Sequence, residues 1–249
     1  MIHSTRRRAR RAAAIVGTAG IALASACGSG DHDAPDVTPI AQIASDPSPP
    51  AENGVDQLAP ADALDASIEA MQESGAFTVR GTTKAGSTID MAFQIGVGTQ
   101  GTVTTDSEVR LVAVDGSVYV TGDPAAIAEQ IGDDVDETIA DKWLLLPSDS
   151  TAGFRMLTGA TAFTESVLRN AAATEITSVR DLDGRPAVGI LFAATGATLW
   201  VAADGEPTPL QFDEKGATGD HGVLTFGDYG GEVDIAPPDP DNVVDPSEE

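Results

Sequence analysis

The sequence contains very little cysteine, few basic residues and few aromatic residues. One cysteine in 249 residues excludes an internal disulfide framework and a cysteine-rich zinc site. Only 14 Lys and Arg residues stand against 39 Asp and Glu residues, and the net charge of −25 argues against nucleic acid as a partner. The same charge disfavours electrostatic docking on anionic lipid headgroups. Hydrophobic residues still make up 41% of the chain, which is sufficient for a folded core.

The sequence also lacks a hydrophobic run near its start that could span a bilayer, which needs roughly 20 residues. The apolar run from Ala12 to Ala26 is shorter and follows five arginines between Arg6 and Arg11. No acidic residue precedes Asp31. A basic segment, a short apolar segment and small residues in this order are typical of an export signal. We therefore predict a signal peptide over residues 1–26, with the general secretory and twin-arginine routes both open.

The only cysteine lies at the end of that segment, in the sequence Leu-Ala-Ser-Ala-Cys-Gly over residues 23–28. Small residues before a cysteine, directly after an apolar segment, resemble a bacterial lipobox, in which the cysteine is acylated and becomes the first mature residue. Ala24 departs from the leucine that is usual three positions before the cysteine. The alternative is an ordinary secretory signal cut near Ala26. We predict that Cys27 is lipidated and anchors the protein to the extracytoplasmic side of the cell membrane.

Removing residues 1–26 leaves nine of the 14 basic residues against all 39 acidic residues, a net charge of −30. Residues 27–59 are rich in Pro and Asp without a sustained period, so we expect a disordered tether spanning roughly 30 Å. Asp31-His32-Asp33 in this tether is not expected to bind a metal, because a flexible segment does not preorganise ligands. We expect one folded domain over residues 60–238 and a disordered acidic tail over residues 239–249.

The predicted domain opens with a helix. Leu64, Ile68 and Met71 recur at the spacing of one helical face between residues 60 and 74. Pro60 suits the first helical turn, and Gly75 suits the position just past the end. This apolar face must pack against another element.

After this helix the spacing of apolar residues changes from the 3.6-residue period of a helix to the two-residue period of a strand. Apolar residues at 77–79 and 89–95 alternate with polar ones, and the turn signal Ala-Gly-Ser at 85–87 separates them. Strands that recur about every ten residues with few helices between them predict an α+β fold. We expect one large curled antiparallel β-sheet, a half-barrel, with helices packed on its concave face. Further strands are predicted at 100–105, 107–114, 117–121, 142–147, 174–182, 185–194, 196–203, 208–213, 222–226 and 231–236, and helical segments within 123–141 and at 151–170.

Such a sheet has a consequence for function. Helices laid into a curled sheet either fill its hollow or leave a cavity, and a cavity could hold an acyl chain at a gain of about 0.8 kcal/mol per methylene. The same apolar alternation is equally typical of a close-packed core, so both interpretations stay open. The predicted lining residues of a cavity are Leu64, Ile68, Met71, Phe77, Val79, Ile89, Met91, Phe93, Phe154, Leu157, Ile190, Phe192, Leu199 and Val201.

Several segments together resemble a known family. They include SGAFTVRGTT from residue 74, DKWLLLP from 141, ATLWVAADGEPTPLQF from 197 and LTFGDYGGEVDIAPP from 224. With the tethered lipobox they resemble the actinobacterial LppX/LprA/LprF/LprG-like lipoproteins over residues 60–240. The resemblance implies a helix-covered half-barrel whose hydrophobic cavity binds or carries lipids or glycolipids of the cell envelope. It implies Cys27 as the anchor and the apolar sheet face as cavity lining, and it implies no catalytic residues. The acidic domain and the Asp-rich segment 123–141 depart from the family.

Catalytic motifs are missing from the sequence. It contains no G-x-S-x-G elbow, P-loop or dinucleotide fingerprint, and His221, the only histidine of the predicted domain, lies in a turn signal. The acidic residues at 133–141 lack the spacing of a calcium loop. We predict no enzyme activity, no cofactor and no metal. Two functions remain: a monomeric lipid-binding or lipid-transfer lipoprotein, and an anchored envelope interaction or signalling lipoprotein with a filled core and no lipid cargo.

Overall fold

A single sheet dominates the computed structural model, which describes residues 50–131, 135, 139, 142–147, 151–215 and 221–246. Within these ranges thirteen strands pair in the order β13-β6-β5-β4-β3-β2-β1-β12-β11-β10-β9-β7, and β8 also pairs with β9. Every pair is antiparallel except β13 with β6. The strands are β1 (Ala76–Thr82), β2 (Thr88–Gln94), β3 (Gly98–Thr104), β4 (Glu108–Val114), β5 (Ser117–Gly122), β6 (Trp143–Leu145), β7 (Glu175–Ile176), β8 (Arg180–Leu182), β9 (Arg185–Phe192), β10 (Ala197–Ala202), β11 (Pro209–Lys215), β12 (His221–Gly227) and β13 (Val243–Val244).

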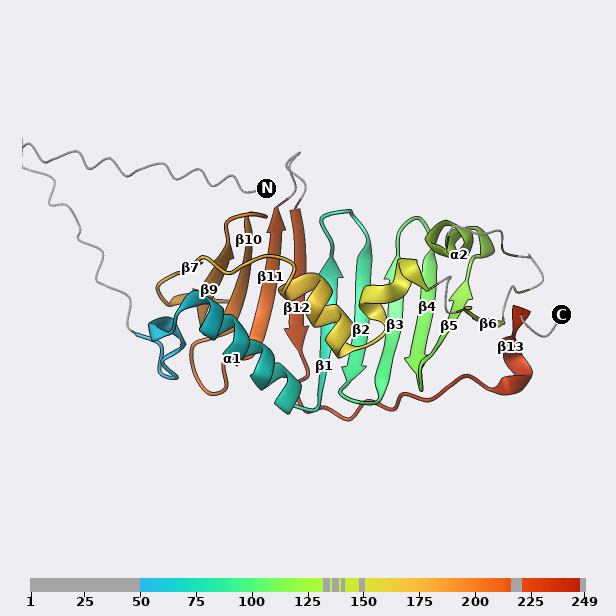
Figure 1. Cartoon of the computed structure of the whole chain (residues 1–249), viewed down its shortest axis with the longest axis horizontal. Helices are drawn as coiled ribbons and strands as arrows, with labels where there is room; N and C mark the ends of the chain where they lie inside the picture. The colour runs from blue at the N-terminus through green and yellow to red at the C-terminus, as the bar shows by residue number, and fades with distance from the viewer. Residues whose placement is uncertain are drawn as a thin grey trace, which may run out of the picture. The chain divides into compact units, whose positions relative to one another are not determined.

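The sheet consists of two meanders, β1 to β6 and β9 to β12, which meet where β1 pairs with β12 (Figure 1). It does not close into a barrel, because its order ends at the two-residue strands β13 and β7. Strands this short leave few unpaired backbone groups at each edge. The predicted α+β class and the large curled antiparallel sheet are therefore confirmed.

Tight turns set the register of the hairpins. Asp115-Gly116 and Asp183-Gly184 join neighbouring strands with positive φ at both residues, 52° and 78° in the first turn and 53° and 86° in the second. This geometry is that of a type I′ turn, whose twist matches that of the flanking strands. An Asp-Gly pair is a typical sequence signal for this turn.

The helices lie against one face of the sheet (Figure 1). Helix α1 (Pro60–Glu73) begins at its proline, ends before Gly75, and buries Leu64, Ile68 and Met71 as predicted. None of the described helices is long and apolar enough to cross a membrane. The other helical segments are η1 (Val55–Gln57), α2 (Pro124–Ile131), η3 (Ala152–Leu157), α3 (Ala160–Phe163), the π-helical turn η4 (Thr164–Leu168) and η5 (Pro240–Asn242).

The ordered chain extends past both ends of the predicted domain. Val55, in the predicted tether, is buried in the core, and the side chain of Asn53 donates a hydrogen bond to the Ala202 carbonyl at 2.9 Å. At the other end, β13 pairs with β6 although its residues fall in the predicted tail. One or two apolar residues inside a polar segment form too short a pattern to predict either contact from the sequence.

Two predicted strands differ from the structure. Residues 231–236 form no strand, because Val233 and Ile235 pack against Val112 and Val114 on the sheet face opposite the helices. The alternation of apolar residues at 231–236 reflects packing on the face of the sheet and not hydrogen bonding to a neighbouring strand. The predicted strand at 174–182 is divided into β7 and β8 around Thr177, whose hydroxyl accepts a hydrogen bond from the Gly189 amide at 2.8 Å.

A chain of aromatic rings holds the helices to the sheet. The Phe77 and Phe93 rings stack with centroids 4.8 Å apart, and Phe93 meets Phe163 of α3 at 5.2 Å. Phe163 in turn contacts Phe226 of β12 edge-on at 6.1 Å. These rings belong to one continuous buried cluster that includes side chains from α1 and both meanders. The packing of both meanders therefore depends on this cluster.

We expect Phe93→Ala to lower the free energy of unfolding by about 3–5 kcal/mol, because it removes the central ring of this chain and leaves a cavity. Urea unfolding followed by tryptophan fluorescence measures the change. Val97→Ala is the control, because Val97 is 44% exposed and its truncation should cost less than about 0.5 kcal/mol. Equal losses in the two variants would contradict this account of the core.

Candidate ligand pocket

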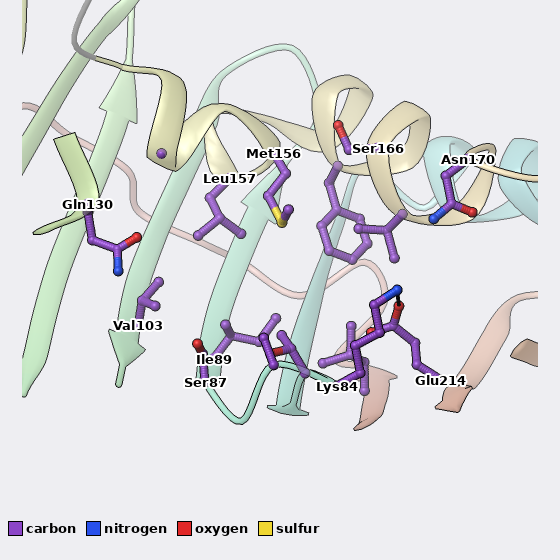
Figure 2. A pocket seen from close by; sticks show the side chains of 16 residues that line it. Lys84, Ser87, Ile89, Val103, Gln130, Met156, Leu157, Ser166, Asn170 and Glu214 are labelled. Carbon is purple, nitrogen blue, oxygen red and sulfur yellow. Dashed lines mark ion pairs between the residues drawn. The ribbon is translucent and has the colours of Figure 1, made fainter. Parts of the chain in front are cut away.

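A pocket of about 330 Å³ lies between the helical layer and the sheet, near the turn that joins β1 to β2 (Figure 2). Ile89 of β2, Val103 of β3 and Leu224 of β12 form its apolar floor. Leu157 of η3, Phe163 of α3 and Val167 of η4 form its roof. The volume falls at the lower end of the range for sites that hold small organic ligands.

Strand register explains why the floor is hollow. Gly81 of β1 pairs with Ile89 on one side and with Leu224 on the other, so no side chain stands between these two residues. An added Cβ at Gly81 would clash with the Val223 carbonyl oxygen of β12. Glycine therefore allows the close approach of β1 and β12 and also leaves the middle of the floor empty.

The roof is built on a widened helical turn. The Arg169 amide donates to the Thr164 carbonyl at 2.9 Å, a hydrogen bond across five residues that defines the π-helical turn of η4. The buried Thr164 hydroxyl donates to the Ala160 carbonyl at 2.8 Å. The hydroxyl is therefore satisfied within the helical layer and needs no partner in the pocket. Arg169 also pairs with Asp65 of α1 at 2.7 Å. Such π-turns occur often at functional sites, and this one fixes the wall formed by Val167.

Polar groups are confined to the rim of the pocket. Lys84 Nζ lies 3.5 Å from Glu214 Oε1, and the Glu214 side chain is only 15% exposed whereas that of Lys84 is 50% exposed. Within the described residues, the side-chain amides of Gln130 and Asn170 make no hydrogen bond, and both line the pocket. Figure 2 shows the ion pair and Asn170 on one side of the pocket, and Met156, which is 43% exposed, beside Leu157 on the helical side. The arrangement suits an amphiphile with its chain inside and its polar end at the rim.

The structure places the predicted lining residues in two groups. Ile89 and Leu157 line this pocket. The remaining twelve are buried in the continuous core cluster between helices and sheet: Leu64, Ile68, Met71, Phe77, Val79, Met91, Phe93, Phe154, Ile190, Phe192, Leu199 and Val201. The sequence analysis did not assign Val103, Leu224 or Met156 to a cavity. The one local signal was Gly81, a glycine within an otherwise alternating strand.

The other polar residues singled out in the sequence fall into exposed positions and into segments outside the described ranges. His221 is exposed at the start of β12, opposite Lys215. No group of three or more His, Cys, Asp or Glu residues in the described ranges could hold a metal ion. Cys27, the signal segment and the acidic positions 133–134, 136–137 and 141 lie outside the described residues.

Comparison with known proteins adds little beyond the geometry. No family model and no curated protein matches this chain. Among solved structures, it is similar to an uncharacterized conserved protein from Thermus thermophilus, with 10% identity and a TM-score of 0.38 over 73% of this chain and 96% of that one. It is also similar to a chain of the MucA/MucB complex of Pseudomonas aeruginosa, with 17% identity and a TM-score of 0.39 over 73% of this chain and 59% of that one. At these scores neither likeness bears on function.

Gly153 allows α2 and η3 to approach closely at one end of the pocket. An added Cβ at Gly153 of η3 would clash with the Gln130 carbonyl oxygen of α2, and both residues line the pocket. We expect Gly153→Ala to lower the free energy of unfolding by roughly 1–3 kcal/mol, because α2 and η3 must move apart. Thermal unfolding checks this. Gly159→Ala is the matched control in the same layer, since nothing lies within 4 Å of its added Cβ. A Gly153→Ala variant as stable as the Gly159→Ala variant would contradict the close contact.

Proposed function

We propose that the protein is an envelope lipoprotein, anchored through Cys27, that binds an acyl chain of a lipid or glycolipid in the pocket under η3, α3 and η4. The observation that carries the proposal is the separation of chemistry within the pocket. Its floor and roof are apolar, from Ile89 and Leu224 to Phe163, and its polar groups stand at the rim. An acyl chain with a polar end has this same division.

The energy of such binding is adequate for a carrier. Burying about eight methylenes gains roughly 6 kcal/mol. This gain corresponds to a dissociation constant of roughly tens of micromolar before ordering costs. Affinity of this order permits both uptake and release. The exposed Met156 beside the opening supports exchange as well, because a flexible thioether side chain adapts to chains of different shape.

The charge of the chain fits an anchored carrier. With a net charge of −30 after the signal segment, the domain is repelled by anionic headgroups. A lipid anchor and a tether would keep the domain near the membrane without pressing it against the surface. An anchor therefore explains how an acidic domain reaches lipid.

The alternative is an anchored interaction lipoprotein without cargo. The close packing of the twelve remaining candidate residues in the core favours this alternative, since a filled interior needs no ligand. The two functions differ in a measurable way: only the carrier loses a binding activity when the pocket is blocked.

Replacing the anchor should release the protein. We expect the wild-type chain, expressed in an actinobacterial host, to partition into the membrane fraction and to carry a diacylglyceryl mass on Cys27. Cys27→Ser should move the protein to the soluble extracytoplasmic fraction, because it removes the thiol that is acylated. Mass spectrometry of the N-terminal peptide and membrane fractionation give the result. An unmodified Cys27 in the wild-type protein would contradict the anchor and leave the pocket proposal untouched.

Filling the pocket should abolish ligand binding. We expect the Cys27→Ser protein to bind a fluorescent dodecanoate, and Val103→Trp in that background to weaken this binding at least tenfold, because the indole occupies the floor. Val97→Trp is the matched control: it adds the same side chain at an exposed valine in the turn between β2 and β3, which does not line this pocket. Fluorescence titration measures both, and mass spectrometry identifies lipids that copurify with the wild-type protein. No probe uptake together with no copurified lipid would favour the alternative function.

A further inference from the structure

A row of polar side chains crosses the sheet face opposite the helices. Arg80 of β1 pairs in register with Asp90 of β2, Asp90 with Thr102 of β3, and Thr102 with Arg110 of β4. On β1, β2 and β4 the row alternates with buried residues that pack on the helix side, namely Val79, Met91 and Leu111. Side chains directly opposite on one face of a sheet lie close enough to act together.

One end of this row is fully paired. Arg80 Nε lies 3.0 Å from Asp90 Oδ1, and Arg80 Nη1 lies 3.0 Å from Asp228 Oδ2. The Thr78 hydroxyl donates to the same Asp228 oxygen at 3.0 Å. The hydrogen bond from the Arg80 guanidinium holds the pKa of the Asp228 carboxyl below its usual value. One arginine is therefore shared by both carboxylates at this end.

The other end has a free cation beside a hollow. Within the described residues Arg110 makes no ion pair and no side-chain hydrogen bond, although the chain holds 39 acidic residues. A shallow trough of about 430 Å³ begins beside it. The trough is lined by Asp90, Ala92, Gln100, Thr102, Arg110 and Trp143. Ala92 is the small residue on its floor, and it leaves room between the polar side chains.

The two tryptophans of the chain provide an internal comparison. The Arg180 guanidinium lies 3.2 Å from the ring centroid of Trp200, and the Trp200 indole donates to Asp213 at 2.9 Å. That pair is closed and satisfied. The Arg110 guanidinium lies 5.7 Å from the Trp143 centroid, and within the described part of the chain the Trp143 indole N–H has no hydrogen-bond partner.

Trp143 is nevertheless held in place. It is half-buried and packs in the cluster of Val112, Val114 and Ile235, which fixes the wall of the trough. The pair of Arg110 and Trp143 is therefore fixed in position. Its guanidinium and indole N–H donors have no hydrogen-bond partner among the described residues.

We propose that this trough binds a saccharide that carries a single carboxylate. The Arg110 guanidinium would hold the carboxylate through two parallel hydrogen bonds. Gln100 and Thr102 offer an amide and a hydroxyl to the sugar hydroxyls, and the indole of Trp143 offers an apolar surface to the ring carbons. A polyanion such as nucleic acid is disfavoured by the surrounding negative charge. The site lies on the sheet face opposite the acyl pocket and does not depend on it.

The test uses the full chain with Cys27→Ser and, as the probe, aldotriouronic acid, a xylobiose that carries one glucuronic acid residue, with xylotriose as the neutral comparison. We expect calorimetry to detect aldotriouronic acid binding that weakens at least tenfold in Arg110→Gln and falls as NaCl rises from about 50 to about 500 mM. Trp143→Leu should also weaken it. Arg180→Gln is the matched control and should bind as the parent does, because Arg180 already stacks on Trp200. Circular dichroism confirms that each variant is folded.

Three results would overturn the proposal. The first is no heat with aldotriouronic acid, and the second is equal affinity for xylotriose and aldotriouronic acid. The third is an Arg110→Gln variant that binds as well as the parent. Titration in the presence of the fluorescent dodecanoate separates the two sites: independent binding supports the trough, whereas competition assigns the sugar to the acyl pocket and overturns it. Loss of dodecanoate binding in Val103→Trp leaves the trough unaffected.

Discussion

The pairing of β1 with β12 is the constraint on which the rest of the structure depends. Each meander is assembled from hairpins whose turns are local, but this pairing joins residues about 150 positions apart in the chain. It is fastened at one end by Asp228, which accepts from Thr78 and Arg80 at 3.0 Å each. The Gly230 amide donates to the Ala76 carbonyl at 2.9 Å just beyond. Closing so long a loop costs entropy, which the aromatic chain across the same joint offsets.

Both candidate sites are built across or beside this joint. The pocket under η3, α3 and η4 has its floor where Gly81 lies between Ile89 and Leu224, so the hollow exists only when the two meanders are paired. On the opposite face, Arg80 belongs to the same strand and pairs with Asp90 at the edge of the trough. The joint therefore positions an apolar site on one face and a polar site on the other, as the alternation of a strand dictates.

Sequence reasoning succeeded where the determining interactions are local. The spacing of Leu64, Ile68 and Met71 and the Asp-Gly pair at 115–116 each specify an element through neighbours in the chain. The location of a gap between layers is different, because it depends on how η3 and α2 approach at Gly153 and on a glycine opposite Ile89. Alternation identifies the face of a strand that is apolar, but not whether a helix fills the space above it. For the same reason the sequence predicted Ile235 to lie in a strand, whereas it packs against Val112 on the face of the sheet.

Some of the few cations of the chain connect distant elements. Nine basic residues follow residue 26, and three of them form ion pairs: Arg80, Lys84 and Arg169. Arg169 connects the π-turn to α1 through Asp65, and Lys84 connects the β1–β2 turn to Glu214 of β11. Exposed pairs of this kind add little stability, about 0–1 kcal/mol each, but they fix relative positions. Among the described arginines, four form no ion pair: Arg110, Arg155, Arg180 and Arg185. Of these only Arg110 lines the trough beside Trp143. Because the carboxylate in the trough lining, Asp90, is paired with Arg80, the charge of Arg110 is left available to a ligand.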